Sequence, residues 1–172
     1  MKKIFVSGLT SSGLGGMEFH NLGNFVIAET LFDNLRKSFP NYKISTSMQM
    51  SINFYERHKL IPKNESRFWT QSSPRTLAIS LIDLIRVMLY KIIHIDWLLK
   101  TPLLQEINTS DIYLDFSGDI YGDNANALAF IEASLRLLIA HWMKKKNAII
   151  IGSPGPFSSY WRQWLAKRVM RS

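Results

Sequence analysis

Apolar and polar residues alternate along this chain in two different periods. Short β-rich or wholly apolar runs predict four strands, over Lys2–Ser7, Tyr42–Met48, Asp111–Phe116 and Ala148–Ile151. Apolar positions spaced three and four residues apart predict helices, over Phe25–Ser38, Ser51–Lys59, Thr76–Lys100, Ala125–Lys145 and Ser158–Met170. Strands that alternate with helices and connect by right-handed crossovers favour an α/β fold: a Rossmann-like parallel sheet with helices on both faces.

A long glycine-rich segment, Gly8–Asn24, follows the first predicted strand. Ligands of wound parallel sheets bind outside the carboxyl ends of the strands, and glycine lets backbone N–H groups approach them closely. The segment matches neither the dinucleotide fingerprint nor the P-loop. We favour a ligand-binding loop over a flexible turn, because loops of this length are uncommon in compact domains and often have a function. Its candidate binding residues are Gly13, Gly15, Gly16, His20, Asn21 and Asn24.

Two further segments follow predicted strands and contribute candidate substrate-binding residues. After the third strand these are Ser117, Gly118 and Asp119, and after the fourth they are Ser153, Gly155 and Phe157. No histidine joins the aspartates at ligand spacing, so we expect no metal site. Capping of the next helix by Asp123 or Asn124 is favoured instead, and Ser158 and Ser159 can cap the last helix.

The composition indicates one domain in a reducing compartment. The 172 residues are 47% hydrophobic, which suits a single domain with a real core. There are no cysteines, so disulfides and thiolate metal sites are excluded and a cytoplasmic location is expected. The first apolar run stops at Ser7, too early for a secretory signal.

The apolar stretch Leu77–Leu99 contains Asp83, Arg86, Lys91 and Asp96, which argue against a membrane span. We interpret it as a packed amphipathic helix. The alternative is a helix lying on a membrane surface, which would give the protein a peripheral membrane contact.

The net charge of +8 is concentrated in residues 133–172, which hold eight basic residues and no acidic one. A solvated face is the simplest interpretation. The alternative is a surface for phosphates, anionic lipid or an acidic neighbouring domain. No nucleic-acid partner is expected, because the chain shows neither an aromatic RNA-binding motif nor zinc-ligand spacing.

Three segments together resemble the amino-terminal domain of the polysaccharide pyruvyl transferases. The segments are the opening strand with its glycine-rich loop and Asn21–Asn24, the strand that leads into Ser117–Asp119, and Gly155–Phe157 with the basic Ala166–Val169 that follows. Their order and spacing agree over nearly the whole chain. One departure is Gly152–Pro154, which stands where the family commonly has a Gln-Ser-like pair.

The resemblance implies one lobe of a GT-B-like enzyme that transfers a pyruvyl group from phosphoenolpyruvate to a glycan hydroxyl. The acceptor would be a glycan or a lipid-linked sugar, as in exopolysaccharide synthesis, and phosphoenolpyruvate would be the donor substrate with no cofactor. The family's catalytic histidine and phosphate-binding arginine lie mostly in a second lobe. No catalytic residue can therefore be assigned here, and we expect this chain alone to be inactive.

Two other classes of function remain open. One is a non-catalytic glycan- or nucleotide-binding α/β module, and the other is a complete flavodoxin-like protein, which would purify yellow with bound flavin. The pair Trp161 and Trp164 lies beside Arg168 on the last predicted helix. We expect these rings to face a second lobe or another copy of the chain.

Overall fold

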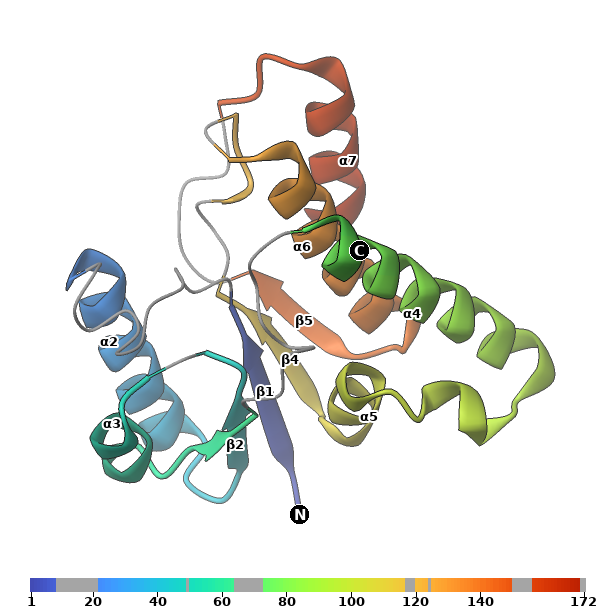
Figure 1. Cartoon of the computed structure of the whole chain (residues 1–172). Coiled ribbons are helices and arrows are strands. Elements are labelled where there is room, and N and C mark those ends of the chain that lie inside the picture. The colour runs from blue at the N-terminus through green and yellow to red at the C-terminus, as the bar shows by residue number, and fades with distance from the viewer. Residues whose placement is uncertain are drawn as a thin grey trace.

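The protein is an α/β domain built on one parallel sheet (Figure 1). The computed structural model describes residues 1–8, 22–48, 50–63, 73–116, 120–123, 125–149 and 156–170. The sheet order is β3-β2-β1-β4-β5, and every neighbouring pair is parallel. The strands are β1 Lys3–Ser7, β2 Lys43–Thr46, β3 Ile61–Pro62, β4 Ile112–Asp115 and β5 Lys146–Ile149. This order confirms the predicted Rossmann-like fold class.

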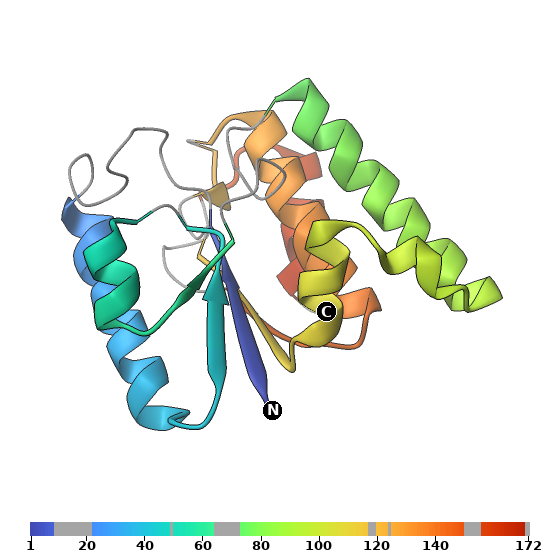
Figure 2. The same cartoon turned by 60° about the horizontal axis from the view of Figure 1, so that its bottom comes forward.

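Helices cover both faces of the sheet, as predicted (Figure 2). On one face lie α2 (Leu22–Ser38) and α3 (Ile52–Arg57). On the other face lie α4 (Pro74–Ile93), α5 (Pro102–Thr109), α6 (Ala127–Trp142) and α7 (Tyr160–Met170), with a short 3-10 helix, η1, at Asp96–Leu99.

The predicted helix Thr76–Lys100 was too long, and α5 was missed. The helix ends at Ile93, because His94 adopts the left-handed conformation (φ 52°) that terminates helices. A second helix then begins at Pro102, where the Thr101 side chain accepts from the Leu104 backbone N–H at 3.4 Å. Proline in the first turn, preceded by threonine, is a start signal that could have been recognised.

Smaller corrections concern other boundaries. The two-residue strand β3 was not predicted, because so short an edge strand has no periodicity to detect. Helix α2 begins at Leu22, so Asn24 lies in its first turn and not in the preceding loop. Helix α6 is capped by Asn126 instead of Asp123. Asp123 accepts a hydrogen bond from the Ser158 backbone N–H just before α7.

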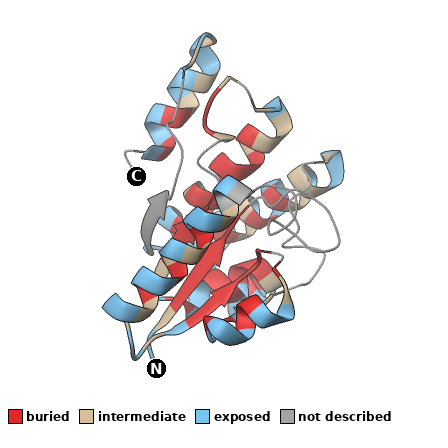
Figure 3. Ribbon diagram, turned by 90° about the vertical axis from the view of Figure 1, so that its left-hand side faces the viewer, coloured by how far each residue is buried: buried red, intermediate tan, exposed pale blue. Residues whose placement is uncertain are grey.

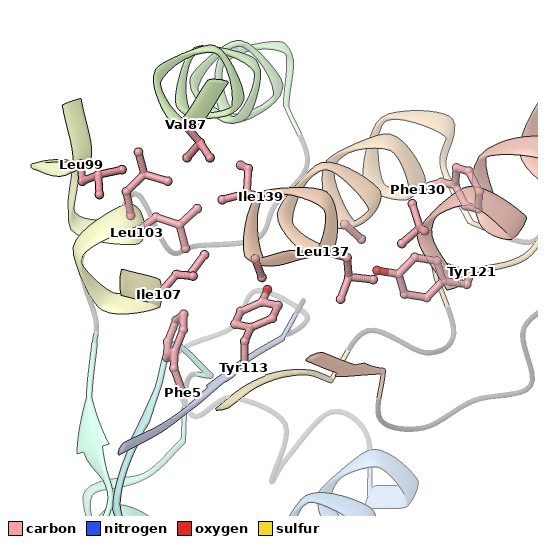
Figure 4. Packing of buried hydrophobic residues seen from close by; sticks show 14 of the residues in the cluster. Phe5, Val87, Leu99, Leu103, Ile107, Tyr113, Tyr121, Phe130, Leu137 and Ile139 are labelled. Carbon is pink, nitrogen blue, oxygen red and sulfur yellow. The ribbon is translucent and has the colours of Figure 1, made fainter. Parts of the chain in front are cut away.

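Alternate residues of the central strands feed two separate cores. Ile4 and Val6 of β1 pack with α2 and α3, whereas Phe5 faces the opposite layer of helices. Figure 3 shows the central strands buried between helices whose outer surfaces are exposed. In Figure 4, Phe5 and Tyr113 lie beneath side chains from α4, α5 and α6. The period-2 alternation therefore separates the core into two layers.

A buried carboxylate ties α5 to the sheet. Glu106 forms an ion pair with Lys3 (2.5 Å) and accepts a hydrogen bond from Ser45 on β2 (2.6 Å). Burial alone would raise the pKa of Glu106, but the bonds from Lys3 and Ser45 outweigh it and lower that pKa. Helix α5 thus covers the sheet itself, and α4 packs chiefly against α6.

Lys144 offers a test of backbone strain at the end of α6. Its φ of 57° is left-handed, a conformation that costs a non-glycine residue about 1 kcal/mol. We expect Lys144→Gly to raise the free energy of unfolding by about 0.5–1 kcal/mol in urea denaturation. The control is Lys100→Gly, at φ −81°, where glycine relieves no strain and should destabilise. A gain in both variants, or in neither, contradicts the assignment.

Candidate functional site

Polar side chains replace the apolar core at the carboxyl end of the sheet. Phe5 and Ser7 of β1 point to the face covered by α4–α7, and their partners in the register are Tyr113 and Asp115 on β4. Ser7 and Asp115 are each 1% exposed. Strands β1 and β4 are the central neighbours from which the chain winds in opposite directions. This is the switch point at which wound sheets bind their ligands.

Asp115 is the centre of a buried hydrogen-bond network. Its Oδ2 accepts from the Tyr121 hydroxyl at 2.7 Å, and its Oδ1 accepts from the Ser7 hydroxyl at 3.4 Å. The Ser7 and Tyr113 hydroxyl oxygens are 2.5 Å apart. Burial and the negative charge of Asp115 raise the pKa of both tyrosines well above its ordinary value of 10.0. Both phenols therefore remain neutral hydrogen-bond donors beside the carboxylate.

A buried ion pair on α6 lies next to this network. The Arg136 guanidinium donates to Glu132 Oε1 at 2.8 Å, and both residues are at most 5% exposed. Burial alone would lower the pKa of Arg136, but the negative charges of Glu132 and Asp115 raise it. The Thr76 hydroxyl donates to Glu132 Oε2 at 2.9 Å and so joins the start of α4 to α6. The guanidinium is thereby committed to a carboxylate.

A small pocket opens between the carboxyl ends of the strands and helices α4 and α6. It has room for about one water molecule. Its hydroxyl side chains come from β1, from the end of β2 and from α4, and α6 supplies its charges. We call it the Ser47 pocket, and its polar lining residues are Ser7, Ser47, Thr76, Ser80, Glu132 and Arg136.

Ser47 is the residue of this pocket whose hydroxyl lacks a hydrogen-bond partner among the described residues. It follows β2 and is 2% exposed, and its backbone N–H continues the sheet by donating to the Val6 carbonyl at 3.2 Å. Within the described part of the chain its hydroxyl has no hydrogen-bond partner. Because buried hydroxyls are almost always paired, this one points to a ligand group or a bound water.

Most residues predicted for the site lie outside the described residues. These are Gly13, Gly15, Gly16, His20, Asn21, Ser117, Gly118, Asp119, Ser153 and Gly155. Asn24 lies on α2, and its side chain is likewise outside the description. Phe157 packs against Phe130 with ring centroids 6.3 Å apart. It therefore contributes to the α6–α7 core, and its role in binding a substrate stays a prediction.

The Ser47 pocket was not foreseen as a site. Arg136 was counted only with the basic residues of the last quarter, although Glu132 and Arg136 stand four residues apart in an otherwise apolar helix. Such a pair is a sequence signal of a buried ion pair. Ser47 carried no such signal, because an isolated serine after a strand is common in turns.

The arrangement can bind hydroxyl groups but offers little for metals. Among the described residues, no group of three His, Asp or Glu side chains lies close enough to hold a metal ion. Comparisons with protein-family models, with curated proteins and with solved structures found no match to this chain. The chemistry of the site therefore rests on its own residues.

The ion pair of α6 should behave as a unit. Arg136→Met leaves Glu132 charged and buried without its partner, which we expect to cost about 3–5 kcal/mol of unfolding free energy. The double variant Glu132→Leu/Arg136→Met removes both charges and should recover most of that loss. Urea denaturation of both single variants and the double variant measures the coupling. Strictly additive losses would contradict a buried pair.

The buried tyrosines predict a loss of stability in alkali. The folded-state pKa of Tyr121 is raised, whereas in the unfolded chain the phenol ionises near 10.0. Its contribution is therefore complete below pH 10 and is lost as the pH rises above that value. Urea denaturation from pH 7 to 11 should show this decline, and Tyr121→Phe should flatten it. An unchanged pH dependence in the variant would sink the assignment.

Proposed function

We propose that this chain is the amino-terminal, acceptor-side lobe of a polysaccharide pyruvyl transferase-like enzyme. In this proposal a glycan or lipid-linked sugar places a hydroxyl at the Ser47 pocket, and phosphoenolpyruvate is the donor substrate. The resemblance of three segments to that family suggests the reaction. The observation that carries the assignment of the acceptor to this lobe is the unpaired Ser47 hydroxyl in a pocket lined by hydroxyl groups.

The charges of the pocket favour a neutral, hydroxylated ligand over an anionic one. Phosphoenolpyruvate carries phosphate and carboxylate charges, which proteins bind with free Arg or Lys side chains. Arg136 is the cation of the described pocket, and Glu132 neutralises it at 2.8 Å. A sugar hydroxyl can both donate to and accept from serine and carboxylate groups without bringing a charge. The donor would then be held by another lobe.

The exposed rings of α7 support contact with another lobe or another copy of the chain. Trp161 is 42% exposed and Trp164 is 60% exposed, while Ala166 and Val169 turn inward to the core. Arg162 anchors the helix by donating to the Gly122 carbonyl at 2.6 Å. Trp161 packs edge-on against Phe130, with the ring centroids 5.6 Å apart, so Trp164 is the more open of the two rings. Exposed tryptophan on a firmly held helix is typical of a protein interface.

The acceptor role is tested by saccharide binding to the 172-residue chain. Ligand-observed NMR with a panel of hexoses and disaccharides should detect one that binds with a millimolar Kd. Ser47→Ala should weaken that binding about five- to ten-fold, the effect of losing one hydrogen bond. It should leave stability unchanged within about 1 kcal/mol, because the hydroxyl has no partner among the described residues.

A matched control and a turnover assay complete this test. Ser45→Ala changes the serine two residues earlier, which lies in β2 and outside the pocket. This variant should bind saccharide as before, although it loses its hydrogen bond to Glu106. Saccharide binding that Ser47→Ala leaves unchanged contradicts the site. Turnover of phosphoenolpyruvate by this chain alone contradicts the acceptor-lobe role. Nucleotide binding that requires Ser47 would instead favour a non-catalytic binding module.

A further inference from the structure

Helix α4 has two apolar faces, and only one of them is covered. The inner face carries Val87, which is 1% exposed and packs into the core with Leu84 and Tyr90. The opposite face exposes seven large apolar side chains between Leu81 and the end of the helix at Ile93, and two more follow it. We call this set the α4 stripe: Leu81, Ile82, Ile85, Met88, Leu89, Ile92, Ile93, Ile95 and Trp97.

Helix α4 packs on its inner face, as predicted, but its outer face is apolar where an amphipathic helix would be polar. Its outer side chains are 42–75% exposed, with Ile92 the most open. The largest apolar patch of an ordinary monomer covers about 300–600 Å², and nine such side chains in a row exceed what scattered exposure produces. Figures 1 and 2 show α4 at the rim of the molecule with its outer side uncovered by any described element. The stripe indicates a docking surface.

Basic residues accompany the stripe. Arg75, Arg86 and Lys100 lie on or just beyond α4, and the acidic residues of this stretch are Asp83 and Asp96. Lys91 points toward α6 instead, with its Nζ 5.1 Å from the centroid of the Trp142 ring. Asp83 is buried at 1% exposure, so Asp96 is the exposed acid in the described residues 74–100. Arg86 lies over the Trp97 ring, 5.2 Å from its centroid, at the edge of the apolar surface.

We propose that the α4 stripe docks this protein on an anionic lipid surface. A long apolar face with lysine and arginine at its margins and tryptophan at one end is the pattern of a helix lying in the bilayer interface. None of the described helices is sufficiently long and apolar to cross a bilayer. The stripe would therefore sink only to the level of the head groups, with its basic side chains at the lipid phosphates.

The charges argue against a second copy as the occupant. Two α4 stripes facing each other would bring Arg75 and Arg86 of both copies together, with Asp96 as the exposed acid available to pair with them. Like charges at a shared apolar seam oppose association. An anionic bilayer can instead bury the apolar face among its acyl chains and pair the basic side chains with its phosphates. This inference stands independently of the proposed pyruvyl transfer.

Vesicle sedimentation of the 172-residue chain tests the proposal. The chain should bind vesicles of phosphatidylcholine mixed with phosphatidylglycerol, and bind pure phosphatidylcholine about ten-fold more weakly. Raising the salt should weaken the binding, because it screens the basic margin. Arg75→Gln should reduce binding about five-fold, and Ile85→Glu/Ile92→Glu should reduce it more than ten-fold. Circular dichroism verifies that each variant is folded.

The matched control is Ile52→Glu, on α3 at the other side of the sheet. Ile52 is 73% exposed, so this variant also replaces an exposed isoleucine by glutamate. Its vesicle binding should equal that of the unchanged chain. Failure to bind mixed vesicles, equal binding to both vesicle types, or an equal loss in Ile52→Glu overturns the proposal. The proposal is also overturned if the unchanged chain does not bind vesicles but forms a dimer in analytical ultracentrifugation, and if Ile85→Glu/Ile92→Glu makes that dimer dissociate. Saccharide binding is measured without lipid, so either proposal can fail alone.

Discussion

Three charged side chains are buried together under the carboxyl end of the sheet, and the surrounding structure has to neutralise them. Asp115 receives the hydroxyls of Tyr121 and Ser7, while Glu132 and Arg136 neutralise each other. A buried charge without a partner costs several kcal/mol, so these contacts leave little freedom in how α6 lies on β1 and β4. The polar cluster therefore helps to fix how α6 lies against the sheet.

The same constraint shapes the candidate site. Because Glu132 also accepts from Thr76, the start of α4 is held against α6 and forms one wall of the Ser47 pocket. In the described pocket, the charges of Glu132 and Arg136 pair with each other. The Ser47 hydroxyl is the pocket group that has no hydrogen-bond partner among the described residues. A pocket of this kind selects for hydroxyl groups and offers a strong anion little. This is the physical basis for the proposed glycan acceptor.

The position of α4 follows from the crossover between β3 and β4. Helix α5 covers the sheet next to β1, so α4 is displaced outward onto α6 and keeps one side free. That free side carries the α4 stripe. The pocket and the stripe thus belong to opposite faces of one helix: Thr76 and Ser80 line the pocket, and Ile85 and Ile92 face outward. A ligand at the pocket and a surface beneath the stripe would meet the same rigid element.

The strands β1, β2 and β4 and the helices α2, α6 and α7 were readable from hydrophobic periodicity, because each buries one face or stripe against a sheet. The break after Ile93 was hidden, since the apolar run continues through Ile95 to Leu99 while the backbone turns at His94. The sequence left open whether α4 would be packed or would lie on a membrane surface, because apolar residues on α4 occur on both sides. Periodicity shows which residues are apolar but not which of them find a partner.

By itself, the sequence determined the fold class, the parallel winding and the carboxyl end of the sheet as the place to look for a site. These follow from local patterns whose energetics act over a few residues. Only the tertiary structure decided that Arg136 is buried with Glu132, that Ser47 lacks a partner among the described residues, and that α4 keeps an apolar face uncovered. Pairing and exposure depend on which distant segments meet, and the chain joins residues as far apart as Thr76 and Glu132 only when it folds.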